Sequence, residues 1–281
     1  MITPDFSECR VVNIETVSGC NLVCAYCSLR NRPIGFMPAE RLDRILRAFS
    51  GARPDLLVAL YLGGEPTLNK DLPALVRLTR DSGFRNIRIH TNGTVNRVGM
   101  WDLLFEAGLS SVVFSVDGSD PEDFERLRPG AKFDVVRKNL LECLSASSGR
   151  NSSIGVLCLV EEPKTLALNS GLSDLTGRMS VTVDRPHSWL KKNSIPGTSR
   201  CGEGPQNPCF FSLNHMAVNV AGDVLPCCLC LNSEATLGSL LHMTARQAWE
   251  GPMEELREKQ RRGEEFSPCS TCERYVRPGK G

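Results

Sequence analysis

Six short apolar runs alternate with amphipathic segments over the first two thirds of the chain, and this alternation restricts the possible folds more than any other feature. The runs have strand length and lie at Val11–Val17, Leu56–Leu62, Asn86–Thr91, Ser110–Val116, Ile154–Val160 and Met179–Asp184. Strands separated by helices pair in parallel through right-handed crossovers, and such a sheet can curl into a barrel. We therefore expect an α/β fold, a partial TIM-like (β/α)6 barrel with helices on its outer face.

The segments between these runs have the apolar periodicity of helices. They are the segment that follows Pro38, and Asp71–Ser82, Arg97–Ala107 and Phe133–Ser145. Barrels of this kind bind ligands at the carboxyl ends of their strands. We therefore expect functional side chains directly after each apolar run.

The alternation ends after Arg185. Pro186–Pro208 is rich in Pro, Gly, Asn and Ser, which favours a linker or an active-site loop. Met216–Val220 and Asp223–Leu225 flank an Ala-Gly turn and predict a hairpin, and Thr244–Arg262 predicts a charged helix. We predict a barrel over residues 1–184, a linker or active-site loop over 185–208 and a small α+β domain over 209–281.

Charge and hydropathy exclude several classes of partner. The chain has 33 basic and 32 acidic residues, so no overall field attracts nucleic acid or an anionic membrane. No apolar run approaches the about 20 residues that cross a bilayer, and Met1–Arg10 lacks the apolar region of a secretory signal. We expect a cytoplasmic protein that acts on a small-molecule substrate, without nucleic-acid or membrane partners.

Thirteen cysteines are unusual for such a protein, because a reducing compartment disfavours a disulfide framework. Two groups have the spacing of ligands. The first consists of Cys20, Cys24 and Cys27, and the second of Cys209, Cys227, Cys269 and Cys272. The other six show no equally tight pattern and are Cys9, Cys143, Cys158, Cys201, Cys228 and Cys230.

The first group follows the first predicted strand, so its three thiolates converge from one loop at a carboxyl end. Three ligands leave one iron of a 4Fe–4S cubane open, whereas clusters that only carry electrons usually have four cysteine ligands. Zinc is the alternative, but zinc sites favour two Cys-x-x-Cys or Cys/His pairs over a single asymmetric triplet. The spacing favours an iron–sulfur cluster.

This loop resembles the motif Cys-x-x-x-Cys-x-aromatic-Cys of the radical S-adenosylmethionine (SAM) superfamily, with Tyr26 at the aromatic position. The resemblance implies a catalytic 4Fe–4S cluster on Cys20, Cys24 and Cys27. Its open iron would bind the amino and carboxyl groups of SAM, and reductive cleavage would give a 5′-deoxyadenosyl radical. A flavodoxin- or ferredoxin-type protein would supply the electron. Tyr26 would lie against the adenine, and packing in the core is its alternative role.

Gly63-Gly64-Glu65-Pro66 directly follows the second predicted strand. Glycines let a backbone approach a ligand closely, and a carboxylate can accept hydrogen bonds from an ammonium. Alone, these residues could be an ordinary turn. Together with the cysteine loop they resemble the family's Gly-Gly-Glu element, which implies that Gly63, Gly64 and Glu65 hold the SAM amino group.

Polar residues also end the third and fourth predicted strands, and turn chemistry alone could explain them. The resemblance implies that they contact SAM or the substrate; they are Thr91, Asn92, Ser115 and Asp117. Arg128 resembles the arginine that meets the SAM carboxylate in many relatives, although Pro129 departs from their Arg-Gly pair.

The second cysteine group supplies four ligands, enough to saturate one cluster, although its spacing suits a zinc ribbon equally well. Its order of hairpin, turn and helix resembles the auxiliary-cluster domain of radical SAM enzymes in its short form, the twitch domain. The longer SPASM form holds two auxiliary clusters and needs more cysteines after the close pair. Nine residues follow Cys272 and none is cysteine, so we expect one auxiliary 4Fe–4S cluster.

The layout most resembles the 2-deoxy-scyllo-inosamine dehydrogenase group, radical SAM alcohol dehydrogenases of aminoglycoside antibiotic biosynthesis. The resemblance implies an oxidoreductase that removes hydrogen from a carbinol carbon of an aminocyclitol or aminoglycoside and forms a ketone. A fully ligated auxiliary cluster suits the acceptance of the remaining electron. Candidates for the base that takes the hydroxyl proton are Arg185, His187, His90 and Asp117. Candidate partners of a substrate ammonium are Glu161, Glu162 and Asp184.

Three alternatives remain open. A radical epimerase of an aminoglycoside would need a thiol hydrogen donor, for which Cys228 and Cys230 are candidates, with packing as their other role. An enzyme that modifies ribosomal peptides would usually carry a peptide-binding segment before the barrel, where this chain has only about ten residues. The non-enzymatic alternative is a zinc-binding module or an electron carrier.

Overall fold

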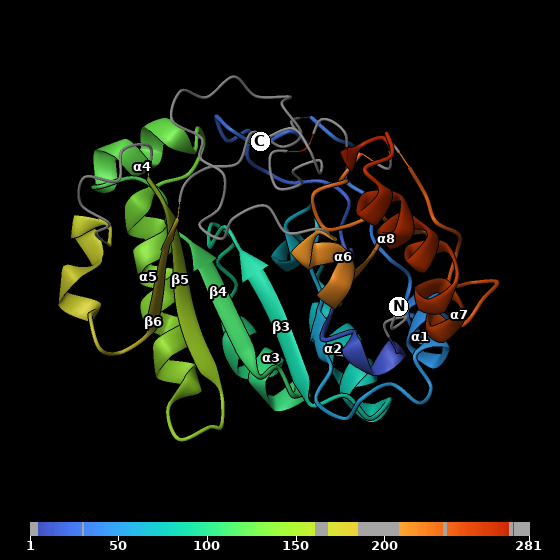
Figure 1. The fold of residues 1–281 in the computed structure, drawn as a ribbon. Coiled ribbons are helices and arrows are strands. Elements are labelled where there is room, and N and C mark those ends of the chain that lie inside the picture. The colour runs from blue at the N-terminus through green and yellow to red at the C-terminus, as the bar shows by residue number, and fades with distance from the viewer. Residues whose placement is uncertain are drawn as a thin grey trace.

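The sheet has the predicted parallel architecture. The computed structural model of the protein describes residues 5–29, 31–160, 168–184, 208–232, 235–269 and 272. The described strands form one eight-stranded sheet in the order β6-β5-β4-β3-β2-β1-β7-β8 (Figure 1). Neighbouring strands pair in parallel, with the exception of the antiparallel pair β7 and β8. The expected α/β class is confirmed.

The six predicted barrel strands and the hairpin are present within a few residues of the expected bounds. The strands are β1 (Val11–Ile14), β2 (Leu57–Ala59), β3 (Asn86–Thr91), β4 (Ser111–Ser115), β5 (Ser153–Leu159), β6 (Ser180–Asp184), β7 (His215–Val218) and β8 (Val224–Leu225). The helices are α1 (Ala39–Ala48), α2 (Leu72–Asp81), α3 (Met100–Ala107), α4 (Pro121–Leu127), α5 (Phe133–Ser147), α6 (Phe210–Asn214), α7 (Ala245–Glu250) and α8 (Pro252–Arg262).

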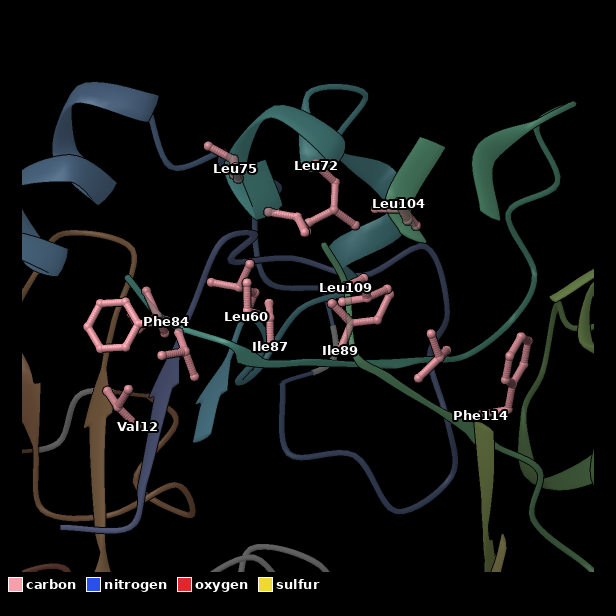
Figure 2. Close-up of a cluster of buried hydrophobic side chains, with 14 of the residues drawn as sticks. Val12, Leu60, Leu72, Leu75, Phe84, Ile87, Ile89, Leu104, Leu109 and Phe114 are labelled. Carbon is pink, nitrogen blue, oxygen red and sulfur yellow. The ribbon is translucent and has the colours of Figure 1, made fainter. Parts of the chain in front are cut away.

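The period of two in each strand separates a helix-facing side from a concave side. In β3, Ile87 and Ile89 are fully buried and pack with Leu104 of α3 in the main hydrophobic cluster (Figure 2). Arg88 and His90 alternate with them and point to the other face, where both are half-buried. The sheet therefore presents polar side chains on the face that the outer helices do not cover.

One predicted helix is wrong in its extent. The segment Thr244–Arg262 forms two helices, α7 and α8, which are divided at Gly251 and Pro252. Proline has no backbone N–H to donate and disfavours helical conformation in the residue before it. Gly251 accordingly has φ −104° and ψ −102°. Ala248, Trp249 and Leu256 are apolar side chains by which these helices pack, since each is at most 1% exposed.

The hairpin continues the sheet of the barrel. Strand β7 pairs in parallel with β1, from Val11 opposite His215 to Ile14 opposite Val218. The Arg41 guanidinium of α1 donates to the Val220 carbonyl, with the two atoms 2.9 Å apart. The N- and C-terminal parts of the chain thus share main-chain pairing, and the domain boundaries at 184 and 208 stay a prediction.

Several sequence-based expectations fall outside the described residues. They concern Arg185, His187, Glu161, Glu162, Cys201 and nearly all of the loop Pro186–Pro208. Within the described part of the chain, no helix has the length and apolar character of a membrane span.

Two adjacent leucines of α3 test the assignment of the core. Leu104 is fully buried, whereas Leu103 is 54% exposed. Leu104→Ala leaves a cavity and should lower the free energy of unfolding by about 2–5 kcal/mol. Leu103→Ala carries the same change in helix propensity and should lower it by at most about 0.5 kcal/mol. Urea denaturation of both variants measures the difference; equal losses would contradict the described packing.

Candidate functional site

The loop after β1 presents the first cysteine group with its sulfurs in contact with backbone donors. The Leu22 N–H donates to Cys20 Sγ and the Leu29 N–H to Cys27 Sγ, each over 3.4 Å. Cys24, between them, is buried. Hydrogen bonds from N–H groups to sulfur are typical of cysteines that bind iron–sulfur clusters as thiolates.

Burial and neighbouring negative groups disfavour thiolates in this loop unless a cationic group is bound beside them. Burial raises the pKa of the Cys24 thiol to about 11, the Arg128 guanidinium opposes this shift, and the Cys27 thiol adds to it. For Cys20, burial is again the largest cause of a raised pKa, and the nearby Glu65 carboxylate adds to it. Three thiolates therefore need a positive partner, and the irons of a cluster would supply it. The assignment of these cysteines as ligands stays our prediction.

Gly63 and Gly64 bring the end of β2 against the cysteine loop. A Cβ atom on Gly64 would lie 2.0 Å from the Val17 carbonyl oxygen and 2.6 Å from that of Gly19. The Glu65 N–H donates to the same Gly19 carbonyl over 3.0 Å. Only glycine permits this approach, which places the predicted Gly-Gly-Glu element beside the cysteine loop.

The Glu65 carboxylate, at the end of β2, is buried and accepts hydrogen bonds on both oxygens. Its Oε1 accepts from the Thr67 N–H (3.0 Å), the Thr67 hydroxyl (2.6 Å) and the Thr91 hydroxyl (2.8 Å). Its Oε2 accepts from the Asn92 N–H over 2.6 Å. Burial raises the pKa of this carboxyl, and the hydrogen bonds oppose the shift. One lone pair of Oε2 remains for a further donor.

Asn92 connects this network to the first cysteine. Its side-chain amide donates to Cys20 Sγ over 3.5 Å and to Asn21 Oδ1 over 3.0 Å. The structure therefore brings Cys20, Glu65, Thr91 and Asn92 together, as the resemblance implied for the surroundings of SAM. Their contacts with SAM stay a prediction.

Asp117 and Arg128 form a buried ion pair beside the cysteine loop. Arg128 Nε and Nη2 each lie 2.5 Å from Asp117 Oδ2, and the Leu159 N–H donates to Asp117 Oδ1 over 3.0 Å. Burial raises the pKa of Asp117, and the guanidinium opposes this shift. Both residues were predicted to face SAM or substrate, and their pairing with each other was not predicted.

Tyr26 and Ser115 lie at the same end of the barrel. Tyr26 is buried, and the adjacent Ala25 N–H donates to the Leu127 carbonyl over 2.9 Å. Ser115 ends β4 on the face opposite the fully buried Phe114, and it is half-buried. The predicted contacts of Tyr26 with adenine and of Ser115 with SAM or substrate stay predictions.

The four cysteines of the second group line one cavity, together with Phe211, Ser212, Pro226, Leu229, Gln260 and Pro268. Burial raises the pKa of the Cys269 thiol to about 12, and the charges of Cys272 and Cys209 add to this effect. Burial likewise raises the pKa of Cys227. Among the described residues, no three His, Cys, Asp or Glu side chains are arranged to hold a single metal ion. Four cysteines around one cavity match the ligand set of a cubane cluster, and their assignment as its ligands stays our prediction.

Gln260 of α8 is a residue of this cavity that sequence reasoning missed. Its Nε2 donates to Cys269 Sγ over 3.5 Å. Its Oε1 accepts from the Cys209 N–H (3.1 Å) and the Ser212 hydroxyl (2.8 Å). No motif contains it, because it meets the cysteines only through the packing of α8 on α6.

The structure also places the candidate hydrogen donors, one candidate base and one candidate partner of a substrate ammonium. Cys230 is fully buried, and its thiol contacts the Ala235 carbonyl over 3.9 Å, which suits a packing role. Cys228 is half-buried and lies near enough to Tyr61 to raise the pKa of that phenol. His90 lies on the concave face of β3, and Asp184 ends β6.

Two family models match the sequence. One is described as the radical SAM superfamily and matches residues 14–164, more than half of the chain. The other is described as an iron–sulfur cluster-binding domain, SPASM, and matches residues 209–273.

Curated relatives match about half of the chain. GTP 3′,8-cyclase of Chlorobaculum tepidum is 33% identical over 145 residues, which cover 49% of this chain and 42% of that protein. Fe-coproporphyrin III synthase of Methanosarcina barkeri is 37% identical over 131 residues, which cover 44% of this chain and 31% of that protein. The chain spans less than half the length of each.

Solved structures share the fold over nearly the whole chain. BtrN in complex with AdoMet and 2-DOIA has a TM-score of 0.63 at 19% identity, covering 95% of this chain and 91% of that one. SuiB of Streptococcus suis bound to precursor peptide SuiA has a TM-score of 0.72 at 17% identity, covering 97% and 76%. Native anSMEcpe with bound AdoMet has a TM-score of 0.60 at 21% identity, covering 93% and 86%.

The Asp117–Arg128 pair can be tested against an exposed pair of the same kind. Asp117→Asn leaves a buried guanidinium without its carboxylate and should lower the free energy of unfolding by about 3–5 kcal/mol. Asp174, which is 57% exposed and lies 2.5 Å from Arg137, is the control. Asp174→Asn should cost less than about 1 kcal/mol. Chemical denaturation under reducing conditions compares them, and a small loss for both would contradict the buried pairing.

Gln260 should tune the auxiliary cluster that its cavity would hold. An N–H donor to a ligand sulfur stabilises the more negative, reduced cluster. Gln260→Leu should therefore make the reduction potential of the auxiliary cluster more negative, as measured by a potentiometric titration followed by EPR. Ser212→Ala removes the hydroxyl that donates to Gln260 and to the Cys209 carbonyl, but it keeps the donor from Gln260 to Cys269 Sγ and should change the potential less. An unaltered potential in Gln260→Leu would contradict this role.

Proposed function

The chain belongs to the radical SAM superfamily, and we propose that it oxidises a carbinol carbon of an aminocyclitol or aminoglycoside to a ketone. Its cofactors are SAM, a 4Fe–4S cluster of the radical SAM type and an auxiliary iron–sulfur cluster. When bound, these groups supply a 5′-deoxyadenosyl radical and an acceptor for one electron. The protein contributes ligands, orientation and the exclusion of water.

The four-cysteine cavity is the observation that carries the proposal. Cys209, Cys227, Cys269 and Cys272 would occupy all four irons of a cubane, so no iron would remain to bind a substrate. A saturated cluster suits electron transfer better than Lewis-acid chemistry. An alcohol that loses a hydrogen atom must still lose one electron and one proton to become a ketone. A saturated cluster could accept the electron.

The first site has the donors and acceptors that the amino-acid part of SAM requires. Cys20, Cys24 and Cys27 would hold its cluster and leave one iron for the SAM amino and carboxyl groups. The remaining lone pair of Glu65 Oε2 would accept from the ammonium. Tyr26, Thr91, Asn92, Ser115, Asp117 and Arg128 would complete the surroundings of SAM, with Arg128 oriented by its pairing with Asp117.

Epimerisation is a second candidate, favoured by the position of Cys228. This half-buried thiol lies near Tyr61 on the barrel, so it could return a hydrogen atom to a substrate radical. The more deeply buried Cys230 is the weaker donor candidate. Peptide modification is a further candidate, because SuiB, a protein of similar fold, was solved bound to precursor peptide SuiA.

Product analysis under anaerobic conditions tests the proposal. The reconstituted enzyme is reduced by dithionite in the presence of SAM and 2-deoxy-scyllo-inosamine, together with a panel of aminoglycosides. We expect a product lighter by two hydrogens and one 5′-deoxyadenosine for each ketone. Cys24→Ala should abolish both products, because it removes a ligand of the radical-forming cluster. Cys227→Ala should retain 5′-deoxyadenosine but lose the ketone, and Cys143→Ala, in the core of α5, is the matched control.

Other outcomes would replace the proposal. Deuterium from D₂O on an inverted carbon would establish epimerisation, and this deuterium should then disappear in Cys228→Ala. Turnover of a peptide but of no aminocyclitol or aminoglycoside would establish peptide modification. Zinc at both cysteine groups without SAM cleavage would exclude radical chemistry altogether.

A further inference from the structure

Tyr61 and His90 form a stacked pair on the concave side of the sheet. Their ring centroids lie 4.2 Å apart and their planes are inclined by 10°. Tyr61 follows β2, and His90 is in β3. The Leu60 N–H donates to the Arg88 carbonyl over 2.8 Å, and this bond between the two segments brings Tyr61 next to His90. Both residues are half-buried, so part of the pair remains accessible.

Asn13 of β1 adds an unsatisfied polar atom to this pair. It is opposite Ala59 in the sheet register, which places it on the same face two residues before Tyr61. The Asn13 side chain hydrogen-bonds to the Tyr61 phenol, and this bond lowers the pKa of the phenol. Asn13 is only 4% exposed, yet its Oδ1 has no hydrogen-bond partner among the described residues. A buried carbonyl oxygen without a donor is costly, and a ligand hydroxyl or ammonium would satisfy it.

The pair also lies between the two cysteine groups. His90 directly precedes Thr91, whose hydroxyl donates to Glu65 in the network of the first group. On the other side, Cys228 is adjacent to the Cys227 of the second group and lies near Tyr61. This position suits a substrate that gives a hydrogen atom at one site and an electron at the other.

The imidazole is in its neutral form near neutral pH. Burial, together with the smaller effect of the nearby Arg88 guanidinium, lowers the pKa of His90 to about 3. One ring nitrogen is therefore an acceptor and the other a donor. Burial raises the pKa of Tyr61 to about 12, so its hydroxyl remains a donor.

We propose that Asn13, Tyr61 and His90 form the site for the reacting hydroxyl of a polyhydroxylated ring, and that His90 accepts the hydroxyl proton. This inference rests on the proposed oxidation of an alcohol. Uncharged donors and acceptors beside aromatic rings suit hydroxyl groups and the apolar C–H faces of such a ring.

Oxidation of the alcohol to a ketone removes one hydrogen atom, one electron and one proton, and each has an acceptor. The alcohol loses the carbinol hydrogen atom to the 5′-deoxyadenosyl radical, one electron to the auxiliary cluster and the hydroxyl proton to His90, and a carbonyl group remains. A neutral alcohol is too weak an acid to protonate this imidazole. After the electron has left, the hydroxyl belongs to a protonated ketone, which is far more acidic than an imidazolium. His90 therefore accepts the proton with or after electron loss.

Substitution of His90 should separate hydrogen abstraction from oxidation. The holoenzyme with SAM is reduced in the presence of 2-deoxy-scyllo-inosamine deuterated at its carbinol carbons. His90→Asn should still transfer deuterium into 5′-deoxyadenosine within about threefold of wild type. Its ketone formation should fall by about 100-fold, the usual contribution of a positioned base. His242→Asn, at an exposed position, is the matched control and should change neither. Tyr61→Phe, which keeps the stack, should weaken binding of the probe in calorimetry without reductant.

The outcomes separate this inference from the proposed function. If wild type forms no ketone from any alcohol, the proposed oxidation fails. If wild type does form ketone, equal ketone formation by His90→Asn would overturn the role of His90. Loss of deuterium transfer together with the ketone, in a variant with wild-type circular dichroism and iron content, would overturn it as well. His90→Gln, which preserves a hydrogen-bonding amide, is the second variant and should show the same separation.

Discussion

The Glu65 carboxylate is the group on which the carboxyl end of the barrel depends. It accepts hydrogen bonds from Thr67 after β2 and from Thr91 and Asn92 at the end of β3. Asn92 in turn donates to Cys20, and the close approach of Gly64 brings the cysteine loop within reach. Two strand ends and a cluster-binding motif are thus oriented by one buried charge. Its burial is costly without donors, so the network and the loop must form together.

A second buried carboxylate connects this end of the barrel to the C-terminal hairpin. Glu15, which follows β1, lies 2.5 Å from Arg32 Nη1 and accepts a hydrogen bond from the Val220 N–H over 3.1 Å. Arg32 comes shortly after the cysteine loop, and Val220 follows β7. The polypeptide that carries the second cysteine group is therefore held against the strand that leads to the first. This connection suits a reaction in which the substrate gives a hydrogen atom at the first site and an electron to the second.

The fold was largely predictable because each of its determinants is local in sequence. Short apolar runs of strand length predict every barrel strand, whereas Gly251-Pro252 divides into α7 and α8 the segment expected to form one helix. The site was only partly predictable. Cysteine spacing identified both groups, and strand ends identified Glu65, Thr91 and Asn92. The pairing of Asp117 with Arg128, the contacts of Gln260 and the unsatisfied oxygen of Asn13 depend on which elements pack together, and no spacing in one sequence encodes that.

Transfer of an electron from the substrate to the auxiliary cluster can be observed by single-turnover EPR. The clusters are first brought to states in which the first is reduced and the auxiliary one is oxidised. Enzyme, SAM and aminocyclitol are then mixed and frozen at increasing times. We expect the signal of a reduced auxiliary cluster to appear at the same rate as the ketone and in equal amount. Ketone formation while the auxiliary cluster stays oxidised would contradict it.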